Sequence, residues 1–271
     1  MMLRMLALIF SILAMTGTAL AQSGGAKQPV SQCQAIAQGL PHVVFARFSP
    51  AAVKDEPVKI SYLGHSTFFL ETPGGVTIAT DYNGWYQPPV TPVVVTMNKA
   101  HSTHYTLTPD PAIRYVLKGW SDVPGEKANH DVVVGDTYIR NVTTDIRAFG
   151  SGAMEHDGNS IFIFETAGLC IGHLGHLHHE LTDAHYAEIG RLDILMVPVD
   201  GGLTMGLDSM SRVVKRLNAS IILPMHRPGL LDRFLDMFDG RFDVARSETD
   251  VITVSLNSLP KRPLILIPRG V

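Results

Sequence analysis

The stretch "VVVTMNKAHSTHYT", Val93 to Thr106, places two histidines shortly after an apolar run. The valines are typical of a buried strand, and the polar residues after Met97 are typical of the loop that follows it. His101 and His104 lie three residues apart, so they can converge on one ion if the loop turns helical. The stretch therefore predicts a site at the end of a strand, where a rigid sheet positions the side chains of loops.

Further histidines are expected at strand ends or in the loops just after them: His156, His173, His176 and His226. His226 follows "SIILPM", an apolar strand with no reason of its own to end in an imidazole. The run "HLGHLHH", which ends at His179, is dense in histidine, but alternation along a strand aims neighbours to opposite faces, so not all of these residues can be ligands. His176 is the best placed because it follows a glycine at the strand exit. A solvated polar loop is the alternative for this run.

The segment "GHSTF", Gly64 to Phe68, resembles the Gly-x-Ser-x-Gly nucleophile elbow of serine hydrolases. The elbow needs a second small residue and a turn from strand to helix, whereas Phe68 stands in the fifth position and a strand is expected to follow. A serine hydrolase that uses Ser66 therefore ranks last among the functions considered. We expect His65 to face the substrate or to support a neighbouring group.

The opening of the chain, "MMLRMLALIFSILAMTGTALAQ", predicts a secretory signal peptide over residues 1–21. A positive residue, Arg4, precedes an apolar run that closes on small residues before a cleavage point after Ala21. A membrane anchor is the alternative, but the apolar run of about 15 residues is shorter than the roughly 20 that a bilayer crossing needs. We expect a secreted or periplasmic protein with no stable membrane insertion after cleavage.

Residues 22–57 are expected to form a leader with one short helix at "SQCQAIAQGL", and residues 58–271 a single domain. The formal net charge is −3, and no basic run or aromatic stripe occurs, so nothing predicts a nucleic-acid partner. The cysteines are Cys33 and Cys170. In an exported protein they can form a disulfide, and two separate thiols are the alternative.

Strand patterns dominate the domain, in the order "VKISYLGHSTFFLET", "VTIATD", "TPVVVT", "DVVVGDTYIRNVTTDIRAFG", "NSIFIFETAGLCIGHLG", "DILMVPV" and "SIILPM". Helices are expected near "PAIRYVLKGW", over 183–189 with a stop at Gly190, and over 209–217 with Asp208 as its N-cap. Such an order predicts an α/β protein in which two sheets pack together with helices outside.

Taken together, these segments resemble the metallo-β-lactamase-fold hydrolases, and most nearly the branch of the ascorbate-6-phosphate lactonase-like proteins. The resemblance spans Val58 to Arg227 and is carried by the strands quoted above together with "HDGNSIFIFE", "IGHLGHLHH", "DILMVPVDGG" and "IILPMHR". It implies a four-layer αββα sandwich with zinc at one edge, held by the loops at strand ends.

The main metal-binding loop of that family reads His-x-His-x-Asp-His, and this chain keeps part of it. By resemblance, Lys99 stands at the first histidine, His101 at the second, Thr103 at the aspartate and His104 at the last. The loop is therefore degenerate at two positions.

The remaining family ligands fall on three more histidines. The next histidine of the family matches His156, the bridging aspartate falls on His176, and the final histidine matches His226. The ligand set implied for this chain is thus His101, His104, His156, His176 and His226.

These departures change the charge of the implied site. Two zinc ions bring more positive charge than neutral imidazoles beside Lys99 can offset, and uncompensated charge in a partly dry site is costly. We therefore expect one zinc ion rather than two. Alternatively, Lys99 takes the place of a metal and acts as a fixed cation for an anionic substrate.

The missing aspartate leaves the position of a catalytic base open. Thr103 can hydrogen-bond the attacking water but cannot act as a base near neutral pH. Asp157 and Asp200 are candidate replacements, and each can equally be a turn residue.

The leading hypothesis is an exported zinc-dependent hydrolase in which activated water attacks an ester, lactone or phosphodiester bond of a small-molecule substrate. The alternative is a degenerate family member that binds a small anion or a metal without catalysis.

Overall fold

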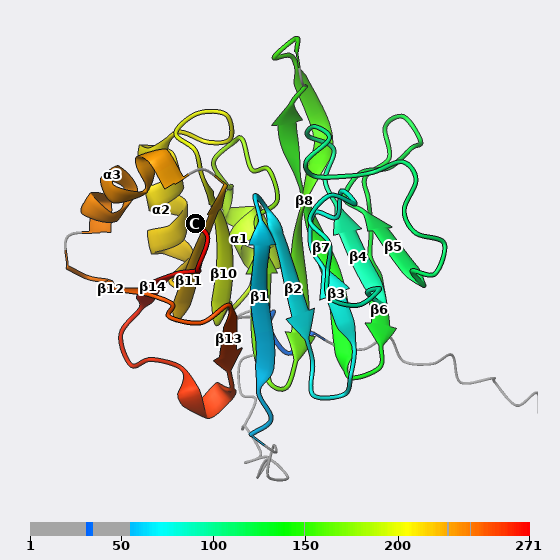
Figure 1. Ribbon diagram of the computed structural model, residues 1–271. Helices are drawn as coiled ribbons and strands as arrows, with labels where there is room; N and C mark the ends of the chain where they lie inside the picture. The colour runs from blue at the N-terminus through cyan, green and yellow to red at the C-terminus, as the bar shows by residue number, and fades with distance from the viewer. Residues whose placement is uncertain (1–30, 35–54, 149, 227, 239) are drawn as a thin grey trace, which may run out of the picture.

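The protein is described by a computed structural model that covers residues 31–34, 55–148, 150–226, 228–238 and 240–271 (Figure 1). The expected signal peptide and most of the expected leader helix lie outside the described residues. None of the described helices has the length and hydropathy that a bilayer crossing requires.

Two β-sheets form the centre of the molecule (Figure 1). The six-stranded sheet has the order β13 (Val251–Val254), β1 (Val58–Gly64), β2 (Thr67–Glu71), β3 (Thr77–Ala79), β4 (Val94–Met97), β5 (Tyr115–Lys118). The eight-stranded sheet has the order β12 (Asp243–Arg246), β14 (Leu264–Ile267), β11 (Ile221–His226), β10 (Ile194–Val199), β9 (Leu169–His173), β8 (Met154–Thr166), β7 (Thr137–Arg147), β6 (Asp131–Val134).

The strands at the centre of the eight-stranded sheet are parallel, and their sequences show it. β9, β10 and β11 run in the same direction. β10 and β11 are buried along their whole length because both faces of the sheet are covered, so they read as unbroken apolar runs rather than as alternating ones. Parallel strands end at the same edge, and this edge receives the loops after β9, β10 and β11.

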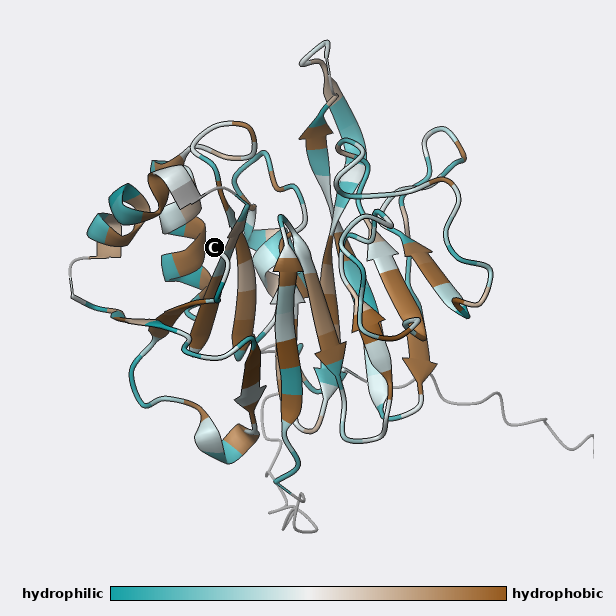
Figure 2. Ribbon diagram, viewed as in Figure 1, coloured by the Kyte–Doolittle hydropathy of each residue, from teal (hydrophilic) through white to brown (hydrophobic). Residues whose placement is uncertain are grey.

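An apolar layer between the sheets holds them together. Phe68, on β2, and Phe162, on β8, are among its fully buried members. Alternation along β2 sends the next residue, Phe69, to the opposite face of the six-stranded sheet. Figure 2 shows the resulting concentration of apolar residues along the strands, whereas the helices alternate between apolar and polar residues.

The helices cover the outer face of the eight-stranded sheet: α1 (Asp183–Ile189), α2 (Leu207–Leu217) and α3 (Leu231–Leu235), with the short 3₁₀ turns η1 (Pro228–Leu230) and η2 (Asp236–Phe238) beside α3. A further 3₁₀ turn, η3 (Leu256–Ser258), follows β13. α2 buries Leu207, Met210 and Val214 on one face, as an amphipathic surface helix does.

The opposite outer face carries loops in the part of the chain that the structure describes. Trp120 and Ile113, from the loops that flank β5, pack on Phe69 and Met97 there. The helix expected at "PAIRYVLKGW" is wrong, since its centre is β5, a parallel edge strand paired with β4. Its β-branched and aromatic residues fit a pleated, half-buried surface, and this pairing overrides the weak helical pattern.

The two other helix predictions differ in their outcome. The helix over 183–189 with its stop at Gly190 is confirmed. The second helix begins at Leu207 rather than at residue 209, and its N-cap is Gly206. Asp208 lies inside the first turn, where its negative charge favours the positive end of the helix dipole.

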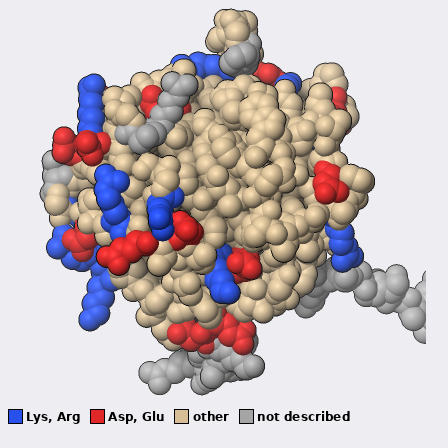
Figure 3. Space-filling view, in the orientation of Figure 1, with Lys and Arg blue, Asp and Glu red and all other residues tan. Residues whose placement is uncertain are grey.

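Charged side chains on the face shown in Figure 3 gather over the helical side of the molecule and near the lower end of β1, with both signs interspersed. On this face they form no extended area of one sign.

Candidate metal centre

Five histidines converge at the edge where β1, β4, β9 and β11 end, which is the upper edge in Figure 1. Their rings form two groups, and within each group one nitrogen from each ring lies within 4.8 Å of the others. One group holds His65, His104 and His226, and the other holds His101, His104 and His176. Residues that are far apart in the chain are therefore gathered around a common point, and His104 belongs to both groups.

The distances within this cluster suit metal coordination. The Nε2 atoms of His65 and His104 are 3.2 Å apart. Two ligands of a tetrahedral zinc ion at the usual bond length of about 2.05 Å lie roughly 3.3 Å from each other. The rings of His65 and His226 stack with their centroids 4.3 Å apart, and the ring of His176 meets that of His104 edge to face at 4.6 Å.

Several of these nitrogens are buried without a hydrogen-bond partner. Both ring nitrogens of His176 and the Nε2 atom of His226 are in this state. A buried polar atom that is left unpaired costs about 1–3 kcal/mol, so such atoms call for an explanation. A cation between the imidazoles would engage them, and the donor set, neutral imidazole, is one that zinc accepts.

The other nitrogens of two of these rings are held by carboxylates. His104 Nδ1 lies 2.6 Å from Asp81 Oδ2, and both side chains are fully buried. His226 Nδ1 lies 2.9 Å from Asp200 Oδ2. Such contacts orient a metal-ligating imidazole and leave its Nε2 atom to face the ion.

Burial sets the protonation of this cluster. It lowers the pKa of His65 to about 4 and holds the pKa values of His104 and His176 below their usual range. All three rings are therefore neutral at pH 7, as metal ligands must be. Burial also raises the pKa of Asp81, because the loss of water around the carboxylate outweighs the hydrogen bonds from Asn98 and Ser66.

Asp200 behaves differently from Asp81. Burial opposes its ionisation, but the hydrogen bond from His226 and those from the backbone N–H groups of Thr204 and Gly202 prevail and hold its pKa below the ordinary value. Asp200 therefore stays a carboxylate that fixes His226 and the loop after β10. Asp200, a candidate for the catalytic base, has both carboxylate oxygens engaged in these contacts, which fit the alternative of a turn residue.

Unusual backbone conformations gather around the cluster. His65, Asp81 and His226 all have positive φ angles, of 50°, 43° and 80°. Non-glycine residues adopt such angles at a cost and persist there only where the surroundings impose them, as they do at functional sites. The N–H of His226 donates to the carbonyl of His65 at 2.8 Å and so joins the two sheets at this point.

A glycine and two asparagine side chains position the loop that carries His176. Gly175 has φ 60°, and a Cβ atom there would lie 2.4 Å from both Asn159 Oδ1 and Asn98 Nδ2. Asn159 Oδ1 accepts the N–H of His176 at 2.7 Å, and Asn98 Nδ2 donates to Asp81 Oδ1 at 2.8 Å. The two asparagines thus fix both a ligand loop and a carboxylate.

The structure does not bring His156 into the cluster. His156 lies on β8 in the hairpin that projects from the sheet in Figure 1, its side chain is 73% exposed, and its Nδ1 atom pairs with Asp145 at 3.1 Å. The ligand role expected for His156 is therefore corrected: the long hairpin formed by β7 and β8 carries this residue outward. The backbone N–H of the next residue, Asp157, also donates to Asp145, and Asp157 lies outside both histidine groups.

Lys99 and Thr103 also differ from their expected roles. Lys99 is half exposed and pairs with Glu155, so its charge is already engaged and it does not replace a metal among the imidazoles. Thr103 places its hydroxyl 2.8 Å from His101 Nδ1, so it orients a ring rather than activating water. Neither contact shows the catalytic role expected of these residues.

Ser66 is fully buried, and its Oγ lies 3.1 Å from His104 Nδ1, the same nitrogen that Asp81 contacts. A catalytic relay needs the serine and the acid on opposite nitrogens of the imidazole. The ranking of the serine hydrolase as last agrees with this geometry.

Two other histidines of "HLGHLHH", His173 and His178, support the fold. His173 Nε2 contacts the carbonyl of Ser66 at 2.9 Å, and His178 bridges Arg147 N and the carbonyl of Leu203. Sequence reasoning gave no role to Asp81, although "VTIATD" ends an apolar strand with a carboxylate. The same signal, a polar residue where a buried strand stops, pointed to His226.

Comparison with known proteins places these features in a family. Residues 59–226 match the model of the β-lactamase superfamily domain. A structure from Thermotoga maritima, described within the metallo-β-lactamase superfamily, is 32% identical over 78% of this chain and 98% of its own, with a TM-score of 0.56. The chain matches none of the curated proteins with which it was compared.

Two more distant structures share the fold alone. A protein from Parabacteroides distasonis is 13% identical, with coverage of 68% of this chain and 89% of its own and a TM-score of 0.53. The metallo-β-lactamase-fold protein YhfI of Bacillus subtilis is 12% identical, with coverage of 73% and 100% and a TM-score of 0.51. The chain belongs to the β-lactamase superfamily and has the metallo-β-lactamase fold.

Proposed function

We propose that this protein is a metal-dependent hydrolase that uses one zinc ion, held by His104 together with histidines of the two groups. The observation that carries the proposal is a cluster of buried imidazoles in which both ring nitrogens of His176 and the Nε2 atom of His226 lack partners, while Asp81 and Asp200 hold the outer nitrogens of His104 and His226. The Thermotoga maritima relative is assigned as a Zn-dependent hydrolase, which supports the choice of metal.

The proposal of one ion rests on His104. Its Nδ1 atom is engaged by Asp81 and Ser66, so only Nε2 remains for a metal. An imidazole nitrogen offers one lone pair and binds one ion, yet both groups need this nitrogen. The groups thus share one ion, which takes its ligands from either group or from both, and variants at His65 and His101 distinguish these arrangements.

When bound, a zinc ion with imidazole ligands and an open position supplies a Lewis acid for hydrolysis. The chain's own residues prepare the site for it. Asp81 and Asp200 fix which nitrogen of His104 and His226 faces inward, and burial keeps His65 and His176 neutral. The buried Asp81 carboxylate also gains a compensating charge when a cation is present, which offsets the cost of its burial.

A second candidate function is metal or anion binding without turnover. Thr103 stands where the family's loop has an aspartate, and the carboxylates of Asp81 and Asp200 are both committed to imidazoles. This arrangement gives the zinc hydrolase no dedicated proton acceptor among the contacts described above. Metal binding with no hydrolysis of any substrate tested would favour the binder.

We further propose that the protein is exported. Cys33 and Cys170 form a disulfide, and disulfides persist in oxidising compartments outside the cytosol. The apolar opening of the chain supports the same proposal as a signal peptide. An epitope-tagged chain expressed in its source cell should be recovered outside the cytosol, shortened at its N-terminus; recovery of the full-length chain in the cytosol would contradict export.

The bond that is cleaved is proposed as an ester, lactone or phosphodiester, with lactones foremost because of the resemblance to the lactonase-like branch. The test is metal analysis of the purified protein before and after incubation with zinc, followed by assays on one substrate of each class. We expect close to one equivalent of zinc and hydrolysis that a chelator abolishes. Less than about a tenth of an equivalent after reconstitution would sink the proposal.

A further inference from the structure

A cavity of about 530 Å³ opens beside the histidine cluster. His101 and His176 form one side of it, and the tip of the β7–β8 hairpin and the loop after β10 form the rest, with Arg147, His178 and Leu203 among the lining residues. A volume of this order suits a small molecule. A substrate in this cavity would reach the candidate ligands directly.

The charge of this cavity has one sign. Its described lining contains an arginine and three histidines but neither aspartate nor glutamate. The remaining lining residues are small or apolar, such as Ala148 and Leu203. The cavity therefore combines a single permanent cation with an apolar wall, a combination that recognises a small molecule with an anionic group.

Arg147 is the permanent cation, and it is held in place without being neutralised. Its Nη2 atom donates to the backbone carbonyls of Gly202, Leu203 and Thr204. All three acceptors are neutral, and no carboxylate of the described residues forms an ion pair with Arg147. The guanidinium thus keeps its charge, and two of its nitrogens, Nε and Nη1, make none of these three bonds.

The neighbouring His178 reinforces this position. Its Nδ1 atom accepts the N–H of Arg147 at 2.6 Å, and its Nε2 atom meets the carbonyl of Leu203 at 2.8 Å. The ring of His178 therefore links the backbone of Arg147 to the loop after β10, whose carbonyls accept hydrogen bonds from the Arg147 side chain. An arginine fixed in this way is prepared to bind carboxylate or phosphate through two parallel N–H groups.

Lys99, the cation expected from the sequence to meet an anionic substrate, does not line this cavity. It pairs with Glu155 and lines a different depression, together with Asp122 and Asp157. The cation available beside the imidazoles is therefore Arg147.

We propose that the cavity binds the anionic group of the substrate and that Arg147 determines this specificity. The proposal rests on the proposed function, because it assigns the substrate class of the same site. Carboxylate and phosphate share the chemistry that Arg147 recognises, so the substrate is a small ester or lactone that carries one of these groups.

The test compares matched acetate esters on the zinc-loaded full-length protein. The pair 3-acetoxybenzoate and 3-acetoxybenzamide differ in one group, an anionic carboxylate against a neutral carboxamide of similar size, and 3-acetoxyphenyl phosphate separates phosphate from carboxylate. We expect the wild-type kcat/KM to be about 10-fold or more higher for an anionic ester than for the neutral one. Arg147→Met should bring this ratio to about 1 by raising KM for the anionic ester.

Two further variants separate recognition from folding. Arg147→Lys keeps the charge but not the planar fork, so it should retain part of the preference. Arg216→Met removes an arginine of α2 that pairs with Asp183 outside the cavity, and should leave the ratio unchanged. If Arg147→Met fails to fold, Arg147→Gln takes its place. An equal preference in wild type and variant overturns the proposal.

A binding measurement keeps this outcome distinct from failure of the proposed function. Calorimetric titration with 3-acetamidobenzoate and with neutral 3-acetamidobenzamide, neither of which carries an ester, reports recognition without turnover. If no ester, lactone or phosphodiester is hydrolysed, the proposed function fails; weaker binding of 3-acetamidobenzoate to Arg147→Met than to wild type still supports the anion site. Equal binding of that anion to both proteins overturns the anion site whether or not an ester is hydrolysed.

Discussion

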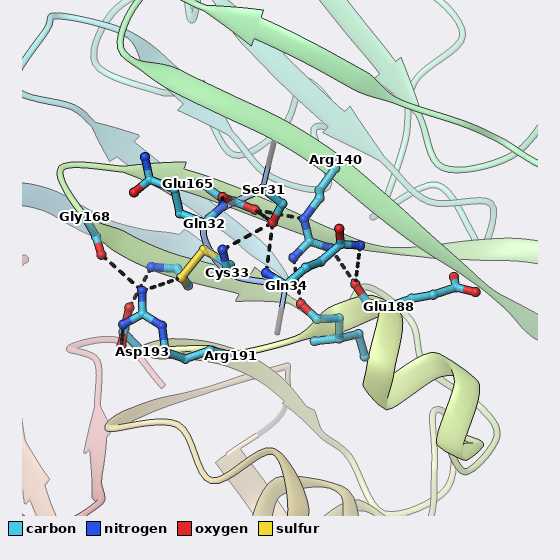
Figure 4. Close-up of a disulfide and its surroundings, with 12 residues drawn as sticks. Ser31, Gln32, Cys33, Gln34, Arg140, Glu165, Gly168, Glu188, Arg191 and Asp193 are labelled. Carbon is cyan, nitrogen blue, oxygen red and sulfur yellow. Dashed lines mark hydrogen bonds and ion pairs between the residues drawn. A yellow bond between two sulfur atoms is a disulfide. The ribbon is translucent and has the colours of Figure 1, made fainter. Parts of the chain in front are cut away.

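The two ends of β9 carry two clusters of buried polar groups that are built in opposite ways. Near its start, Cys170 forms the disulfide with Cys33, and Glu165 on the adjoining strand binds Arg140 (Figure 4). Past its other end, His176 reaches the imidazole cluster with both ring nitrogens unpartnered.

At the disulfide end the polar atoms have partners. Glu165 accepts from Ser31, from the N–H of Gln32 and from Arg140, whose other two nitrogens donate to the carbonyls of Glu188 and Ile189. These bonds fasten the segment of residues 31–34 onto the sheet (Figure 4). A satisfied buried network of this kind stabilises a fold and offers nothing to a ligand.

At the histidine end the unpaired atoms point to something outside the chain. Apart from Thr96 Oγ1, every buried side-chain nitrogen or oxygen without a partner in the described residues belongs to a histidine: His176, His179 or His226. The contrast within one sheet teaches that unsatisfied atoms, rather than the number of histidines, mark the functional end.

The largest effect is expected from His104→Ala, which removes the imidazole common to both groups. Zinc affinity should fall by more than about 1,000-fold, because one ligand and the link between the groups are lost together. The measurement is zinc content by metal analysis together with competition against a chromophoric chelator. His185→Ala on α1, outside both groups, is the matched control and should keep its zinc. Retention of zinc by His104→Ala would mean that the histidine end of β9 is not the metal site.

The next effect concerns the disulfide end. Replacing both Cys33 and Cys170 by alanine should lower the free energy of unfolding by about 2–5 kcal/mol, since the bond closes a long loop in the unfolded chain. Denaturant titration of the double variant and of the wild type measures this difference. Zinc content of the folded variant should match that of the wild type. A parallel loss of zinc would show that the two ends act as one unit.

A smaller effect is expected from Asp200→Asn. The carboxylate holds His226 Nδ1, and loss of such a contact typically weakens metal binding by about 10–100-fold. Zinc affinity measured at constant pH tests the expectation, and Asp183→Asn, at an exposed position on α1, serves as control. An affinity equal to that of the wild type would mean that His226 does not bind the ion.

The smallest effect is expected from His156→Ala, which tests the structure against the family motif. The exposed ring lies outside both groups, so zinc affinity and turnover should change by less than about twofold. Parallel assays of His156→Ala and wild type are sufficient. A loss comparable to that of His104→Ala would show that the hairpin brings its histidine to the ion.

The sequence predicts much of this arrangement for a simple reason. His101, His104, His176 and His226 stand where apolar strands stop, and parallel strands must stop at a common edge. The metallo-β-lactamase fold is confirmed by the match over residues 59–226. The positions of these histidines after apolar strands and the order of the strand motifs can both be read from a single sequence without an alignment.

The misplaced residues depend on geometry that no local pattern contains. His156 matches the family motif in order, but the direction of the β7–β8 hairpin decides whether it reaches the cluster. Asp81 contacts His104 across the space between two loops, which only the packed strands define. The pairing of Lys99 with Glu155 likewise joins residues from different sheets.

The hydrogen bond from His226 N to the carbonyl of His65 shows that the two sheets meet at the histidine cluster, which bears on how firmly a metal ion would hold them together. His65 and His104 lie in loops that follow strands of the six-stranded sheet, whereas His226 ends β11 and His176 follows β9 of the eight-stranded sheet, so an ion at this point would link the two sheets. Shearing one sheet along the other would then require rupture of coordination bonds. Loading with metal should accordingly slow amide hydrogen exchange in both sheets at once, including strands that never approach the ion.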